Sequence, residues 1–112
     1  MTDVHRERRK AARVQANTIR ELDLRTTVPV EILDVSENGV LAKSSAPLAT
    51  ARRCRLRLKL GDRPFVAEVS VTRCRHSTPG GDGYRIAAVF TGMTEENRRT
   101  LHQFLERASA RQ

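Results

Sequence analysis

Alternation of apolar and polar residues is the dominant pattern along this chain. In Cys54–Leu60, every second residue is apolar and the residues between are basic, so a strand there would turn one face to the core and the other to water. Segments 13–20 and 28–32 alternate in a similar way, and three further segments are predicted strands: the short segment 40–42, the Val- and Thr-rich segment 65–74, and 84–90. These segments follow one another closely with no helical pattern between them, which predicts six strands in a small antiparallel barrel or sandwich. A parallel sheet is excluded because each crossover would need about a dozen residues.

The C-terminal segment has a helical period instead. Its large apolar residues recur at i, i+3, i+4 and i+7: Leu101, Phe104, Leu105 and Ala108. Thr94 is a candidate N-cap, and Glu95 and Glu96 lie in the first turn, where the helix dipole favours negative charge. We therefore predict an amphipathic helix over about residues 94–108, with its apolar side buried against the barrel.

Residues that favour turns separate the predicted strands. Asp34–Gly39 contains Asp and Ser, which bond to nearby backbone N–H groups, and a glycine, which tolerates positive φ. Gly61–Pro64 is predicted to be a hairpin loop, and Ser77–Gly83 a longer loop. The first two strands are expected to join through Asp23–Arg25.

The length of 112 residues fits one domain with one core. Thr2–Ala12 is almost free of apolar residues and cannot bury enough surface to offset its ordering entropy. Residues 1–12 are therefore expected to form a flexible basic arm, and residues 13–108 the folded domain. No apolar stretch approaches the roughly 18 to 20 residues of a membrane-spanning helix. The polar N-terminus lacks the features of a secretory signal, so a cytoplasmic location is expected.

Charge and chemically reactive side chains narrow the possible functions. The formal net charge of +8 attracts anions, among them nucleic acid, acidic lipid and phosphorylated small molecules. Single-stranded nucleic-acid binders stack bases on exposed aromatic rings. The four aromatic residues here are Phe65, Tyr84, Phe90 and Phe104, and most of them belong to the predicted core. Neither the two cysteines nor the three histidines have the spacing of metal ligands, and no nucleophile is paired with a base, so no metal site and no catalytic residue is expected.

A cluster of arginines lies where the arm meets the first strand. The guanidinium groups of Arg8, Arg9 and Arg13 carry planar forks of donors that fit phosphate oxygens bidentately and also fit the O6 and N7 edge of guanine. Lysine would serve the phosphate and not the guanine edge. With Arg9 and Arg13 four positions apart, an ordered arm could aim both at one ligand. Taken alone, the segment also fits a solvated basic tail.

The predicted turn at 34–39 carries a second set of recognition groups. The Asp34 carboxylate can accept both N1–H and the exocyclic amine of guanine, and the Ser36 hydroxyl can serve phosphate or base. Gly39 would let backbone approach a ligand closely. Taken alone, this string also fits an ordinary β-turn with an Asx-type bond.

The two strings together resemble the signature of the PilZ domain family, RxxxR followed further along by D/N-x-S-x-x-G. The first is Arg9-Lys10-Ala11-Ala12-Arg13 and the second is Asp34-Val35-Ser36-Glu37-Asn38-Gly39. The strand at Gly83–Phe90 and the closing helix are also similar to that family. The resemblance implies a six-stranded antiparallel (split) β-barrel with a flanking helix.

By the same resemblance, the N-terminal arm would fold over the bacterial second messenger cyclic di-GMP. Arg9 and Arg13 would grip guanine and phosphate, Asp34 and Ser36 would contact a guanine, and Gly39 would shape the turn. Arg8 matches the extra arginine that often precedes the RxxxR string. The implied protein is a receptor without a cofactor, acting as a monomer or homodimer. Ordering of the arm would signal to a downstream protein partner.

Two alternatives are of other functional classes. One is a PilZ-like adaptor that acts through proteins without binding a ligand. The other is a small basic nucleic-acid-binding barrel, which explains the charge but leaves the paired motifs and the scarcity of outward aromatic residues as coincidence. An enzyme is not supported, because the sequence offers no paired catalytic groups.

Overall fold

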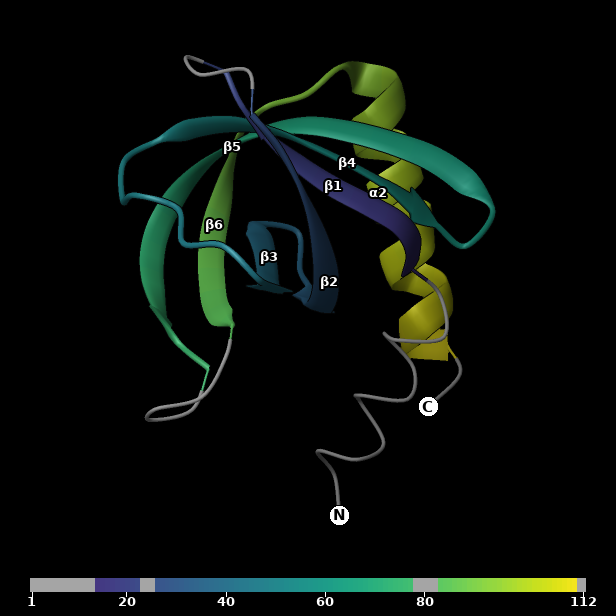
Figure 1. Cartoon of the computed structure of the whole chain (residues 1–112). Coiled ribbons are helices and arrows are strands. Elements are labelled where there is room, and N and C mark those ends of the chain that lie inside the picture. The colour runs from purple at the N-terminus through teal and green to yellow at the C-terminus, as the bar shows by residue number, and fades with distance from the viewer. Residues whose placement is uncertain (1–13, 23–25, 78–82, 111–112) are drawn as a thin grey trace.

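The computed structural model describes residues 14–22, 26–77 and 83–110. The predicted arm at residues 1–12, the Asp23–Arg25 connection and most of the predicted loop at 77–83 lie outside the described residues. Figure 1 shows a barrel with a helix against one side. The elements are β1 (Val14–Glu21), β2 (Thr27–Val35), β3 (Gly39–Ser44), β4 (Arg53–Leu60), β5 (Arg63–His76), β6 (Tyr84–Gly92) and α2 (Glu95–Ala110).

The six strands form a closed barrel in the order β1-β2-β3-β6-β5-β4. Every neighbouring pair is antiparallel, including β1 with β4, which closes the ring. The predicted all-β class, the six strands and the single C-terminal helix are confirmed. Closure gives every one of these strands a neighbour on each side.

The β4–β5 hairpin corrects one predicted boundary. The loop expected over Gly61–Pro64 is shorter, because Leu60 pairs with Arg63 and Lys59 pairs with Pro64. Only Gly61 and Asp62 form the turn, and Gly61 has a φ of 68°, as the first position of a tight hairpin turn requires. Pro64 is tolerated because the pairing of β5 with β6 begins further along, at Glu68.

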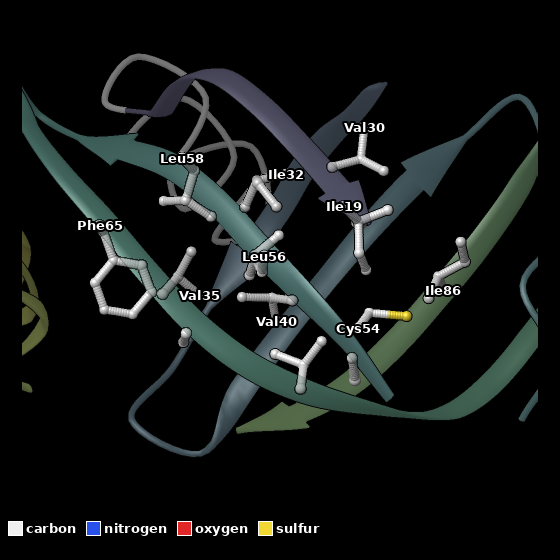
Figure 2. Close-up of a cluster of buried hydrophobic side chains, with 14 of the residues drawn as sticks. Ile19, Val30, Ile32, Val35, Val40, Cys54, Leu56, Leu58, Phe65 and Ile86 are labelled. Atoms are coloured by element: carbon white, nitrogen blue, oxygen red, sulfur yellow. The ribbon is translucent and has the colours of Figure 1, made fainter. Parts of the chain in front are cut away.

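The core occupies the barrel interior, where Figure 2 shows a cluster of its side chains. It also extends to the helix. In β4, the predicted alternation is complete: Cys54, Leu56, Leu58 and Leu60 are buried and the basic residues between them are exposed. The apolar side of α2 contributes Leu101 and Phe104 to the same core.

Hydrogen bonds of the Thr94 and Asn97 side chains fix the N-terminal end of α2. The Thr94 hydroxyl accepts the Asn97 backbone N–H (3.2 Å), which confirms the predicted N-cap. The Asn97 side-chain oxygen accepts the Val66 N–H of β5 (3.0 Å), which ties the helix to the barrel. The helix extends to Ala110, two residues past the predicted end. This described helix is not long and apolar enough to cross a membrane.

The burial of Cys54 can be tested by measuring how the free energy of unfolding depends on pH. The pKa of its thiol is raised to about 11, mainly by burial and also by the nearby charge of Glu21, while Arg52 opposes the shift. Because the folded state then holds the proton more tightly than the unfolded state, the free energy of unfolding should fall as pH rises from about 9 to about 11. A fall of up to about 2 kcal/mol is expected in urea unfolding. Cys54→Ala should flatten this slope, whereas Cys74→Ala, at a half-buried position, should keep it.

Candidate functional site

A β-bulge in β2 sets the direction of the Asp34 side chain. Val28, Val30 and Ile32 point inward with a period of two, which if continued would also point Asp34 inward. The register shifts at Leu33, so that Asp34 pairs with Leu41 and Val35 pairs with Val40. One extra residue reverses the faces, so Val35 is buried and Asp34 is half-buried on the outer surface beside Leu41.

The turn after β2 is held by the Ser36 side chain. The Ser36 Oγ accepts the backbone N–H groups of Asn38 (3.2 Å) and Gly39 (3.3 Å), while the Ser36 N–H donates to the Gly39 carbonyl (2.9 Å). The Asn38 carbonyl in turn accepts the Phe90 N–H of β6 (2.8 Å). The turn is therefore confined to residues 36–38 and fixed to β6, with Asp34 and Gly39 in the flanking strands.

The Ser36 hydroxyl keeps a proton that is only weakly engaged. Its oxygen accepts two backbone N–H groups, which use its two acceptor sites. The distance from Oγ to the Gly39 carbonyl, the acceptor for its own proton, is 3.4 Å, which is long for an O–H···O bond. Toward a bound molecule this hydroxyl would therefore act as a donor.

Gly39 permits close approach between two strands. A Cβ at this position would lie 2.1 Å from the Ala88 carbonyl oxygen and 2.9 Å from the Val89 Cα, both in the backbone of β6. Its φ lies outside the left-handed region, which the described glycines Gly61 and Gly83 occupy. The tolerance of glycine for positive φ is therefore not used at this position. No side chain fits between β3 and β6, and that is the physical requirement for glycine.

The outward faces of β3, β5 and β6 form a shallow hollow beside this turn. It has a volume of about 230 Å³, and its lining includes Asp34, Ser36, Leu41, Thr72, Ala87 and Val89. Val89 is 39% exposed, and among the described residues it is the only large hydrophobic residue that is exposed. A carboxylate and a hydroxyl therefore border a hollow with apolar side chains in its lining, a setting suited to a flat heteroaromatic ring with N–H donors on its edge.

Several of the residues that line this hollow were not predicted from the sequence. Ala87 and Val89 lie on the outer side of β6, where the alternation with buried Ile86 and Ala88 could have indicated them. Thr72 could not be found in this way, because it sits at a register shift between Val71 and Arg73. Its hydroxyl donates to the Ala87 carbonyl (3.1 Å), which holds β5 against β6 at this point.

The structure describes half of the six residues predicted for the site. Asp34, Ser36 and Gly39 come together around one turn and border the same hollow. Arg8, Arg9 and Arg13 lie outside the described residues. Within the described parts of the chain, no group of three or more His, Cys, Asp and Glu residues could hold a metal ion.

Comparison with known proteins identifies one family. A model of the PilZ domain matches residues 7–107, which is nearly the whole chain. The matched region includes both the arginine string and the turn at 34–39. A search of curated proteins found no match, and neither did a search of solved structures.

Proposed function

Because this chain belongs to the PilZ domain family, a family of cyclic di-GMP receptors, we propose that it binds cyclic di-GMP and acts as a receptor rather than an enzyme. The observation that carries the proposal is the geometry around Asp34. The bulge at Leu33 turns this carboxylate outward, beside a partly apolar hollow large enough for a nucleobase.

Guanine has the functional groups that this site would complement. The Asp34 carboxylate would accept N1–H and the exocyclic amine, a pair of donors that guanine offers on one edge. The ring face would lie against the floor formed by Leu41, Ala87 and Val89. Ser36 would donate its weakly engaged proton to a phosphate or base oxygen.

The N-terminal arginines would complete the site from the other side of the ligand. Arg9 and Arg13 would bind phosphate and the O6 and N7 edge of guanine through their donor forks, with Arg8 as an additional contact. Ordering arm residues costs about 1 to 2 kcal/mol each. Charge-assisted hydrogen bonds return about 1.5 to 3 kcal/mol each. A net affinity in the micromolar range, about −8 kcal/mol, is expected.

Arm ordering would be the signal. A segment that becomes ordered only over a bound ligand presents a surface that the free protein lacks, and a partner protein can read that difference. Titration calorimetry of the wild type with cyclic di-GMP tests the proposal directly, because it reports both saturable binding and stoichiometry. Absence of saturable heat at high micromolar ligand would favour the ligand-independent adaptor.

Asp34→Ala should weaken cyclic di-GMP binding by about tenfold to a hundredfold, because it removes charge-assisted hydrogen bonds to guanine. The thermal unfolding midpoint should change little, since Asp34 lies on the outer surface and contributes no core contact. Asp62→Ala is the matched control, because it removes the same charge from the exposed β4–β5 turn. Equal weakening in both variants would mean that net charge, rather than guanine recognition, sets the affinity.

A further inference from the structure

A row of cations covers the barrel wall formed by β4 and β1. Arg53, Arg55, Arg57 and Lys59 are all exposed on the outer face of β4, and Arg20 of β1 is exposed beside them. These five residues are called the β1–β4 basic face below. Because alternate residues of a strand are spaced about 6.6 Å apart, the row on β4 is about 20 Å long.

The charges on this face are poorly compensated. Arg20 lies directly opposite Arg55 in the β1–β4 register, an arrangement that destabilises a sheet. Glu68 of β5 is paired with Arg55 in the β4–β5 register. Among the described residues, however, no ion pair joins Glu68 to Arg55. The core uses only the inward residues of β4, so the barrel itself does not require arginine on the outside.

A small hollow lies at the centre of the face. It has a volume of about 160 Å³ and is lined by Thr18, Arg20, Thr27, Arg55 and Arg57. Three guanidinium groups and two hydroxyls therefore surround one space large enough for a phosphate group. Arginine forks and threonine hydroxyls are the donors that proteins commonly use toward phosphate oxygens.

The β1–β4 basic face is separate from the hollow bordered by Asp34, the described part of the proposed cyclic di-GMP site. In the ring order β1-β2-β3-β6-β5-β4, the β1–β4 seam is opposite the β3–β6 seam. Gly39 and Val89 pair across the latter seam, next to the hollow bordered by Asp34. A ligand on one wall would therefore leave the other wall accessible.

The residue composition of the β1–β4 basic face favours one class of binding partner over others. Protein interfaces are depleted of charge at their centre and anchored by aromatic or large apolar residues. In the described part of the chain, the exposed large hydrophobic residue is Val89, on the opposite wall. Single-stranded nucleic acid would need exposed stacking rings, which this face also lacks. Duplex nucleic acid needs neither, because its backbone is held by Arg, Lys and hydroxyl donors.

We propose that the β1–β4 basic face binds the phosphate backbone of duplex nucleic acid without reading its sequence. The scarcity of outward aromatic residues argues against binding of single-stranded nucleic acid. It does not argue against binding of a duplex through its phosphate backbone. A duplex carries one charge per about 1.7 Å, so a row of about 20 Å meets more phosphates than it has cations. Affinity should therefore depend steeply on salt.

Fluorescence anisotropy with a labelled DNA duplex of mixed sequence, about 20 base pairs long, tests this over 50 to 200 mM salt. Arg55→Gln/Arg57→Gln should weaken binding at 50 mM salt at least tenfold and flatten the slope of log K against log salt by about 2, since each phosphate contact contributes about 0.9. Arg55→Lys/Arg57→Lys should keep the slope, because the charges remain.

The matched control is Lys43→Gln/Arg85→Gln, which removes an exposed cross-strand pair of cations from the opposite wall. It should leave the slope nearly unchanged. Equal losses in the two double Gln variants would overturn the proposal, as would absence of duplex binding at 50 mM salt. Cyclic di-GMP titration of Arg55→Gln/Arg57→Gln should match the wild type, so this proposal and the receptor function can fail independently.

Discussion

Gly39→Ala is expected to destabilise the fold by about 3 kcal/mol or more, a large share of the stability of a domain of this size. The added Cβ would lie 2.1 Å from the Ala88 carbonyl oxygen, a distance that no real contact of this kind shows. The clashing atoms belong to the backbone of β6, which cannot rotate away as a side chain could. Relief would require β3 and β6 to separate, with loss of the hydrogen bonds between them.

Gly61→Ala is the informative control for this variant. Gly61 has a φ of 68°, so alanine there is strained, but a Cβ would meet no atom within 4 Å. Its expected cost is about 1 kcal/mol, the usual penalty for a non-glycine residue in the left-handed region. Urea unfolding of both variants separates the effect of a steric clash with β6 from the effect of backbone strain at positive φ. A Gly39→Ala variant as stable as Gly61→Ala would show that the β3–β6 seam can widen.

The architecture was readable from the sequence because its main determinants are local. In a strand such as β4, the alternation of apolar and polar residues indicates directly which side chains are buried. Cys54, Leu56 and Leu58 are all buried, as this alternation predicts. The helix was equally clear, since its apolar period, its N-cap at Thr94 and its acidic first turn all lie within α2 and the residue before it. In these segments local pattern and tertiary packing agree.

The site was less readable because it depends on register between distant segments. The period of β2 alone would turn Asp34 inward, and only the shift at Leu33 turns it outward. The need for glycine at position 39 arises from Ala88 and Val89, about fifty residues further along the chain. The turn chemistry of Ser36 was predicted correctly, because its partners are two and three residues away.

The barrel explains how one small domain could present two unrelated anion-binding surfaces. Closure gives every strand an outward face, and the core constrains only the inward residues. On the β3–β6 side the outward residues are small or apolar around Asp34, whereas on the β1–β4 side they are basic. If the first surface binds a guanine ring and the second a phosphate backbone, as proposed, recognition would be decided by outward residues that contribute little to folding.

Arg9→Ala and Arg13→Ala are each expected to weaken cyclic di-GMP binding by a hundredfold or more. A bidentate guanidinium contact comprises two charge-assisted hydrogen bonds, worth together about 3 kcal/mol or more, which in titration calorimetry would take a micromolar Kd to about 100 μM or above. Arg9→Lys should recover only part of the loss, because an ammonium group can meet phosphate but lacks the fork that fits guanine O6 and N7.

Lys10→Ala is the matched control for these variants, because it removes the same charge from between Arg9 and Arg13 and leaves the RxxxR string intact. Its affinity should stay within a few fold of the wild type, as expected for a cation that contributes only to the long-range field. If Lys10→Ala weakened binding as much as Arg9→Ala, the arm would act through its total charge. The specific pairing of two arginines with one guanine dinucleotide would then have to be abandoned.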